Sequence, residues 1–226
     1  LPFEKDFYKK HQVDAHFVGH PLLDAISDLP EISVENFKKE NGLNEKEIIA
    51  LLPGSREQEV EKMLSLMLSV RDSFKNYQFV IAGAPSLPKE FYQKFVDDDV
   101  HFVSNKTYDL LRCSKAALVT SGTATLETAL LNVPEIVCYR TSTISYEIGK
   151  RVVKNIKFIS LVNLIMDREI VKELIQKELN TENLVTELQK ILEGQKRDKM
   201  LKNYELLREK LGGKGASEHA AEIIVN

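Results

Sequence analysis

Two strand-to-helix turns constrain what this chain can fold into more than any other feature. A continuous apolar run at residues 48–52 enters the turn 53–56, and a second run at residues 117–120 enters the turn 121–123. An apolar strand, a small-residue turn and a helix form the repeating unit of a parallel sheet covered by helices. The pair therefore predicts an α/β fold with a doubly wound parallel sheet.

Short apolar, β-rich runs alternate with amphipathic helical segments as far as residue 139, and the pattern then changes. After Arg140 the β character fades, which predicts a helical C-terminal tail. We expect strands at residues 16–18, 48–52, 78–82, 100–103, 117–120 and 135–139, and helices at 35–42, 57–74, 88–96, 107–113, 123–131, 145–154, 170–178, 182–192, 196–211 and from Ser217 onward.

Composition excludes several classes of protein. The chain has 226 residues and a net charge of -3, which argues against nucleic acid as its main partner. No apolar run is long enough to span a bilayer. Cys113 and Cys138 lie far apart in apolar surroundings, which favours two reduced thiols and a cytoplasmic protein. Because the chain begins with Leu1 and not with Met, we expect a processed, truncated or excised chain.

The first turn carries groups that suit a phosphate. A helix start leaves backbone N–H groups free, and these favour an anion. Gly54 lets the backbone approach a ligand, Ser55 can cap the helix or bind a phosphate oxygen, and Arg56 adds a phosphate-matching cation. The alternative is a capped turn with an exposed Arg. Neither the P-loop pattern nor the GxGxxG dinucleotide pattern is present.

The second turn predicts a further anion site with a sugar-binding group beside it. Ser121, Gly122 and Thr123 resemble the small-residue turns that hold a diphosphate, and Glu127 can accept hydrogen bonds from a diol such as ribose. The alternative is that Thr123 caps the helix and Glu127 lies on a solvated face. Both turns should lie at the C-terminal edge of one sheet, so together they predict a site for a nucleotide diphosphate.

Three other features have weaker interpretations. One is a polar group made of Asn163, Arg168 and Glu169. The local sequence predicts a loop followed by the start of a helix, with Asp167 as the cap, and this favours a structural role for the group. The basic amphipathic segment 144–158 suits either an anionic lipid surface or a core-facing helix. We find no metal-ligand spacing among the histidines and no local pair of acid and base carboxylates.

Blocks along nearly the whole chain also match a known family, in the family's order. They are LPFE at 1–4, FVGH at 17–20, LLPGSR at 51–56, SGTATLE at 121–127, YR at 139–140, KRVVK at 150–154, SLVNLI at 160–165, RE at 168–169 and VKEL at 171–174. With these blocks the chain resembles the lipid-A-disaccharide synthases, which are inverting glycosyltransferases of lipid A biosynthesis. Residue 162 is Val where relatives often have Pro.

The resemblance implies a domain arrangement. The family has the two-domain GT-B fold, and this chain is similar to its carboxy-terminal, donor-binding half, with one Rossmann-like sheet. Residues 1–25 would end the acceptor-side domain and form the hinge, and residues 26–195 would bind the UDP-sugar. Residues 196–226 would pack across to the other domain or to a partner in a homodimer. The amino-terminal half, with the catalytic base, would lie outside this chain.

The resemblance also implies a reaction without metal or cofactor. UDP-2,3-diacylglucosamine would donate its sugar to 2,3-diacylglucosamine 1-phosphate, which gives lipid A disaccharide 1-phosphate and UDP. Arg56 and the turn 121–123 would hold the diphosphate, Glu127 the ribose, and Asn163, Arg168 and Glu169 the donor sugar or phosphate, with Arg56 and Asn163 catalytic. The segment from Ile144 would contact acyl chains or the cytoplasmic face of the inner membrane.

Two alternatives stay open at this point. One is an isomerase similar to UDP-N-acetylglucosamine 2-epimerase, which shares the fold and the nucleotide-sugar. That family has a His- and Arg-rich turn where this chain has Gly54, Ser55 and Arg56. The other is a nucleotide-sugar binding module without catalytic activity. By itself, this chain is expected to bind UDP and to transfer sugar weakly or not at all.

Overall fold

The structure is a computed structural model that describes residues 1–141 and 157–225. The helix expected at residues 145–154 lies outside the described residues, as does nearly all of the basic segment 144–158. No helix in the described part of the chain is long and apolar enough to cross a membrane.

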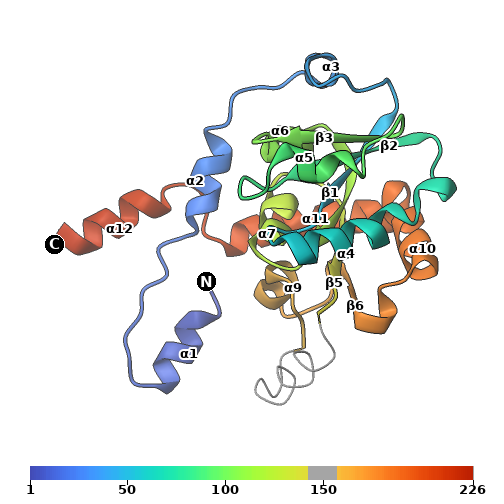
Figure 1. Ribbon diagram of the computed structural model, residues 1–226. Coiled ribbons are helices and arrows are strands. Elements are labelled where there is room, and N and C mark those ends of the chain that lie inside the picture. The colour runs from blue at the N-terminus through green and yellow to red at the C-terminus, as the bar shows by residue number, and fades with distance from the viewer. Residues whose placement is uncertain (142–156, 226) are drawn as a thin grey trace.

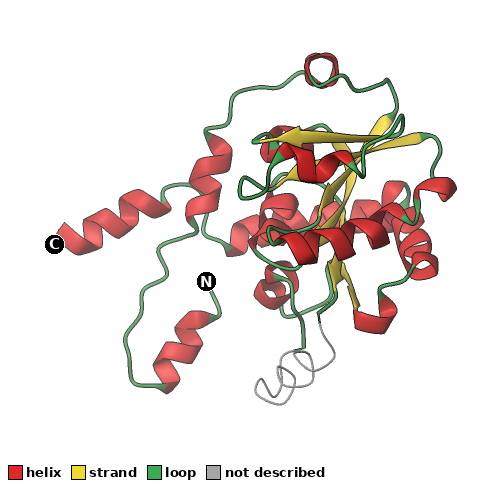
Figure 2. Cartoon of the chain, in the orientation of Figure 1, coloured by secondary structure: helices red, strands yellow, loops and turns green. Residues whose placement is uncertain are grey.

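The central element is a parallel sheet of six strands in the order β3-β2-β1-β4-β5-β6. Figure 2 shows the strands enclosed by helices. This arrangement confirms the predicted doubly wound sheet with a helical C-terminal tail. The strands are β1 (Glu47–Leu52), β2 (Tyr77–Gly83), β3 (Val100–Ser104), β4 (Ser114–Thr120), β5 (Glu135–Tyr139) and β6 (Lys172–Ile175).

Both faces of the sheet are buried, which explains the continuous apolar runs. In β1, Ile49 and Leu51 belong to one core cluster, whereas Ile48, Ala50 and Leu52 belong to the other. This alternation follows from the two-residue repeat of a strand. The first cluster includes α4 (Glu57–Leu68), α5 (Lys89–Gln93), α7 (Thr123–Leu130), α9 (Leu161–Met166), α10 (Thr181–Leu192) and α11 (Gln195–Lys210), and the second includes α3 (Val34–Glu40) and α6 (Thr107–Arg112).

The strand β6 corrects the prediction of a helix at residues 170–178. Lys172 and Glu173 gave this segment the charge density of a surface helix, but it pairs with β5 at the edge of the sheet. Val171 and Leu174 are buried there, and the carboxylate of Glu173 is buried with hydrogen-bond partners from the chain. Tertiary contacts therefore override the local pattern. The short 3-10 helix Gln176–Glu178 follows the strand.

Helix positions also differ from expectation, most of all at the end of α4 and at α9, which was not predicted. The helix predicted over 57–74 ends as α4 at Leu68, and the separate 3-10 helix Arg71–Ser73 follows it. Asp167, expected to begin a helix, instead ends α9 in the left-handed conformation with φ 50°. Ser160 caps the start of α9, because its hydroxyl accepts a hydrogen bond from the Asn163 N–H.

Residues 16–18 were predicted as a strand, and this was wrong. They have no place in the sheet and run beside the C-terminal helix, where the Val18 carbonyl faces His219 at 3.4 Å. A Cβ on Gly19, whose φ is +105°, would lie 3.1 Å from the Cβ of Ala216, so glycine permits this close approach. The segment is a packed connection because no strand is beside it to pair with.

Three helices lie to one side of the sheet, and one of them, Pro21–Ser27, packs against α7 and the first core cluster through Leu22, Leu23 and Ile26. Figure 1 shows α1 (Glu4–Lys10), α2 (Pro21–Ser27) and α12 (Ala216–Val225) on the left, away from the strands. The carboxylate of Asp24 on α2 accepts hydrogen bonds from the N–H groups of Gly215 and Ser217, which joins α2 to the start of α12. By contrast, α11 buries Met200, Tyr204 and Leu207 in the first core cluster. Within the described tail, only α12 lies away from the sheet.

Candidate functional site

The two predicted turns lie side by side at one edge of the sheet. β1 and β4 are neighbouring parallel strands, and Leu52 is in register with Val119 near their C-terminal ends. The chain moves outward from β1 to β2 and β3 and then crosses back to β4, so the strand order reverses between β1 and β4. Such a reversal is the place where open parallel sheets bind ligands.

Both turns line one cavity of about 440 Å³. Among the predicted residues, the cavity lining includes Gly54, Ser55, Ser121, Gly122, Thr123 and Glu127. The start of α7 faces this space, and the N–H groups of Thr123 and Ala124 have no carbonyl partner among the described residues, whereas that of Thr125 donates to Gly122. The cavity therefore offers backbone donors and a helix dipole to an anionic group.

The first turn is open to solvent. Gly54 has φ +105°, a conformation that other residues rarely adopt. The Ser55 carbonyl accepts a hydrogen bond from the Ser86 hydroxyl at 2.9 Å. The side chain of Arg56 is 82% exposed and lies 3.5 Å from the Glu59 carboxylate, which itself lines the cavity. The guanidinium is thus beside the cavity and not among its lining groups.

The second turn is tied to distant parts of the chain. The Ser121 N–H donates to the Cys138 carbonyl at 3.2 Å, and its hydroxyl donates to the Ile159 carbonyl at 2.9 Å. The Thr125 hydroxyl donates to the Gly122 carbonyl at 2.9 Å. With its hydroxyl proton already engaged, Ser121 supports the turn, while the N–H groups that follow it face the cavity.

Glu127 is oriented by a residue that sequence reasoning missed. The Tyr108 hydroxyl on α6 donates to Glu127 Oε1 at 3.0 Å. Burial, followed by the nearby Glu127 carboxylate, raises the pKa of Tyr108 to about 12, so the phenol keeps its proton at neutral pH. One oxygen of Glu127 is therefore held by a neutral donor, and the other is left for a hydroxyl group of a ligand.

Other lining residues also escaped the sequence analysis. Thr107, Thr120 and the segment 82–85 complete the cavity wall. The Thr120 hydroxyl is buried without a hydrogen-bond partner among the described residues. At Gly83 an added Cβ would lie 2.2 Å from the Phe102 ring, so a side chain at this strand end requires that ring to shift. The Gly-Ala-Pro run after β2 was the available signal for a third turn at the same edge.

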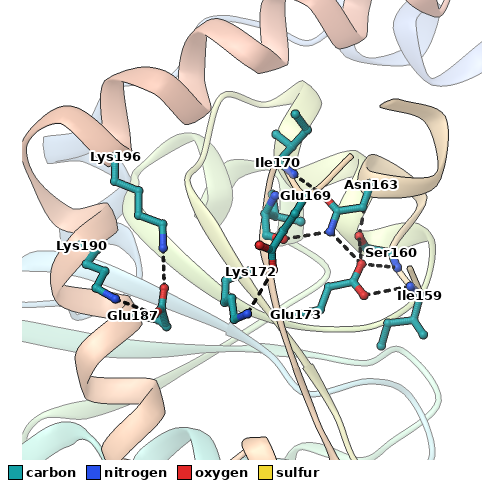
Figure 3. A network of polar contacts seen from close by, with 11 residues as sticks. Ile159, Ser160, Asn163, Glu169, Ile170, Lys172, Glu173, Glu187, Lys190 and Lys196 are labelled. Carbon is teal, nitrogen blue, oxygen red and sulfur yellow. Dashed lines mark hydrogen bonds and ion pairs between the residues drawn. The ribbon is translucent and has the colours of Figure 1, made fainter. Parts of the chain in front are cut away.

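The structure places Asn163 in the interior, away from the cavity lining (Figure 3). Its Oδ1 accepts from the N–H groups of Ile170 and Val171 at 2.7 and 3.0 Å, and its Nδ2 donates to the Val171 carbonyl and the Glu173 carboxylate at 2.9 and 2.8 Å. These bonds use both donors and both acceptor positions of the amide. Asn163 thus joins α9 to β6, which is the structural role that its local chemistry favoured.

Arg168 and Glu169 are likewise not brought to the cavity. The guanidinium of Arg168 donates to Asn203 on α11 at 2.7 Å, and Glu169 accepts from Lys172 at 3.1 Å. Contact of Asn163, Arg168 or Glu169 with a donor sugar stays a prediction, because it would require these side chains to exchange their present partners.

The described residues contain neither a reactive thiol nor a cluster of metal-ligating side chains. Cys113 and Cys138 are both free and buried, as predicted. Burial raises the pKa of Cys113 to about 11 and that of Cys138 further, so both are protonated at neutral pH. Within residues 1–141 and 157–225, no group of three or more His, Cys, Asp or Glu side chains is arranged to hold a metal ion.

Comparison with known sequences identifies relatives along the whole chain. A family described as lipid-A-disaccharide synthetase matches residues 1–225. The lipid-A-disaccharide synthase of Syntrophus aciditrophicus is 38% identical over 231 residues, covering 98% of this chain and 60% of that protein. The enzyme of the same name from Persephonella marina is 36% identical, covering 99% and 62%. The chain thus spans about 60% of the length of these relatives.

Solved structures share the fold at low identity. A UDP-N-acetylglucosamine 2-epimerase has a TM-score of 0.55 at 17% identity, covering 97% of this chain and 54% of that one. The UDP complex of MnaA from S. aureus has a TM-score of 0.56 at 16% identity, covering 89% and 51%. The spinosyn rhamnosyltransferase SpnG with thymidine diphosphate scores 0.55 at 11%, covering 81% and 46%. At such identities the likeness concerns the fold alone.

Proposed function

The chain belongs to the lipid-A-disaccharide synthetase family, and on this basis we propose that it is the donor-binding part of a glycosyltransferase. The proposed reaction moves 2,3-diacylglucosamine from its UDP derivative to 2,3-diacylglucosamine 1-phosphate and releases UDP. The observation that carries the proposal is the single cavity lined by both turns and by Glu127. It offers backbone donors for a diphosphate and a carboxylate for a ribose.

The chemistry at this cavity is stabilisation of the leaving group. As the sugar departs, negative charge grows on the diphosphate, and the N–H groups at the start of α7 strengthen their interaction with it. Arg56 reaches the same charge when its guanidinium leaves Glu59. Glu127 positions the nucleoside by accepting hydrogen bonds from the ribose. The base that activates the acceptor hydroxyl comes from outside this chain.

The epimerase alternative has weaker support. Proteins with that name share the fold of this chain at 17% identity, whereas the synthases match it at 30% or more along its length. The first turn also carries Gly54, Ser55 and Arg56, not a His-rich sequence. A binding module without activity is distinguished from the proposed transferase part by assay together with the remaining part of the enzyme.

The acceptor-side contact is proposed at the helices outside the sheet. Phe3, Phe7 and Tyr8 at α1 are exposed, as are Ile223, Ile224 and Val225 on α12. The relatives are longer than the matched region, and these apolar side chains suit packing against such additional sequence or a second copy. Residues 1–25 and the end of 196–226 thus serve as the link to the acceptor side. The proposed membrane contact falls almost entirely on residues outside the described ranges.

Calorimetric titration with UDP, UMP and uridine tests the binding role directly. We expect UDP to bind at least tenfold more tightly than UMP, because the site is matched to a diphosphate. In a parallel transfer assay the chain alone should turn over weakly or not at all, and addition of the acceptor-side part of a relative should restore transfer. Equal affinity for UDP and uridine would contradict the proposal.

A further inference from the structure

We propose that Glu173 is a positioning residue of the candidate cleft. Its buried carboxylate holds the backbone at Ile159 and Ser160, and this backbone in turn anchors the turn that begins at Ser121. The inference rests on the proposed function, because it assigns Glu173 a part in shaping the diphosphate site.

The carboxylate of Glu173 accepts hydrogen bonds from one short segment, residues 159–163 (Figure 3). Its Oε2 accepts from the Ile159 N–H at 2.9 Å. Its Oε1 accepts from the Ser160 N–H at 3.0 Å, the Ser160 hydroxyl at 2.6 Å and the Asn163 amide at 2.8 Å. The residue is 6% exposed and comes from β6, so one side chain of the sheet orders the segment that leads into α9.

The chemistry of this position is specific for a carboxylate. A buried charge is costly unless it is hydrogen-bonded, and both oxygens of Glu173 have donors. In the described residues no cation pairs with it, and its neighbour Lys172 pairs with Glu169 instead. All four hydrogen-bond partners of this carboxylate are donors. An amide in its place would therefore point its own N–H groups at one of these donors, where no acceptor is available. The isosteric change is therefore disruptive.

Ile159 connects Glu173 to the cleft. The N–H of Ile159 is held by Glu173, and its carbonyl accepts the hydroxyl of Ser121 at 2.9 Å. Ser121 immediately precedes Gly122 and Thr123, the start of α7 that lines the cavity. Glu173 itself is not among the lining residues. Its effect on a ligand must therefore pass through residue 159 to the orientation of the α7 N–H groups.

Titration of Glu173→Gln with UDP tests this connection. We expect about tenfold weaker UDP binding, as for the loss of one well-placed interaction. The matched control is Glu187→Gln, which removes the same charge from a partly buried carboxylate that bonds Lys190 and Lys196 on the other side of the network in Figure 3. This control should bind UDP like the unmodified chain. Unchanged UDP affinity in Glu173→Gln would overturn the proposal.

A double-mutant cycle identifies the route of the effect. Ser121→Ala breaks the other end of the same connection. If both substitutions act through that connection, their effects on UDP affinity should not multiply. The double variant with Glu173→Gln should then have an affinity within about twofold of that of the single variant that binds UDP less tightly. Losses that multiply would show that Glu173 acts on binding by another path, and would overturn the positioning role. Because Glu173→Gln risks poor folding, Ser160→Ala, which removes one donor to Glu173, serves as the milder variant, with about threefold weaker binding expected.

Hydrogen exchange separates this proposal from the proposed function. In Glu173→Gln, or in Ser160→Ala, the amides of residues 159–160, which donate to Glu173, and of Ser121, which donates to the Cys138 carbonyl, should exchange faster together, with no change in Glu187→Gln. Faster exchange at 159–160 alone would refute the connection to the cleft. If the unmodified chain failed to bind UDP, the proposed function would fall, and the exchange pattern would still decide whether Glu173 orders the Ser121 turn.

Discussion

The two turns of the candidate cleft are built in opposite ways. The first presents Arg56, whose side chain is 82% exposed and pairs with Glu59, and its Ser55 carbonyl accepts a hydrogen bond from the exposed Ser86 hydroxyl. The second is bound to β5 and to residue 159 through the N–H and hydroxyl of Ser121. One turn offers a charge on a long side chain, and the other offers fixed backbone dipoles.

This difference predicts different contributions of the two turns to ligand binding. Backbone donors that are held in place before binding cost little to orient, so in the proposed reaction they would favour the charge that develops as UDP leaves. A mobile guanidinium loses side-chain entropy on binding but gains a strong, charge-assisted pair of hydrogen bonds. The first turn should therefore govern the affinity for the diphosphate, and the second should govern its placement.

Arg56→Ala should have the largest effect on binding. Loss of a charged hydrogen bond to phosphate predicts UDP affinity lower by about 10- to 100-fold, measured by calorimetry. The thermal midpoint should hardly change, because the side chain is exposed. Arg71→Ala, which removes an exposed Arg paired with Asp97, is the control. Equal UDP affinity in Arg56→Ala and the unmodified chain would show that the Arg56 side chain of the first turn does not bind the diphosphate.

Glu127→Ala should affect recognition of the ribose and not of the phosphates. We expect about tenfold weaker UDP binding and, above all, a loss of preference for UDP over its 2′-deoxy analogue, since the hydroxyl partner is removed. The control Glu57→Ala removes an exposed carboxylate from the first turn of α4. A discrimination against 2′-deoxy-UDP that survives in Glu127→Ala would assign the ribose to other residues.

Tyr108→Phe should produce a smaller loss of about threefold in UDP affinity, because Glu127 remains but is less well oriented. The pKa of Tyr108 is raised from 10.0 to about 12. Its contribution to stability is thus complete below about pH 10 and is lost as the pH rises toward 12. The difference in thermal midpoint between the two proteins should be constant from pH 7 to 9 and should shrink above pH 10. A constant difference up to pH 12 would contradict this.

Ser86→Ala should have the smallest effect. It removes the hydrogen bond from Ser86 to the Ser55 carbonyl, which is exposed, so UDP binding should weaken by about twofold or less. Ser121→Ala removes the corresponding bond of the second turn, which is partly buried, and should cost several times more. If both substitutions had the same effect, the proposed contrast between an open turn and an anchored turn would be wrong.

Local sequence was a good guide where local chemistry decides. The apolar run of β1 and the amphipathic pattern of α4 predicted those elements because burial sets their spacing. It was a poor guide at β6, where Lys172 and Glu173 look like surface residues until α9 supplies donors to the carboxylate. It also failed at residues 16–18, whose β-forming residues meet no strand.

The candidate site divides in the same way. Gly54, Ser121 and Glu127 were identified from their positions after two strands, and all three line the cavity. The role of Tyr108 was missed because it lies on a different helix, 19 residues away from Glu127 in sequence. Asn163 was assigned to the donor on the family resemblance, whereas its amide is fully engaged between α9 and β6.

The sequence by itself determined that the sheet is parallel and that two helix starts meet at its C-terminal edge. Both follow from patterns within a few residues, where strand and helix periods and turn chemistry are visible. The tertiary structure alone decided which groups hold these helix starts in place. The bond from Ser121 to Ile159 spans 38 residues and that from Ser160 to Glu173 spans 13. No local pattern specifies such pairs, because they form only when separate segments are packed together.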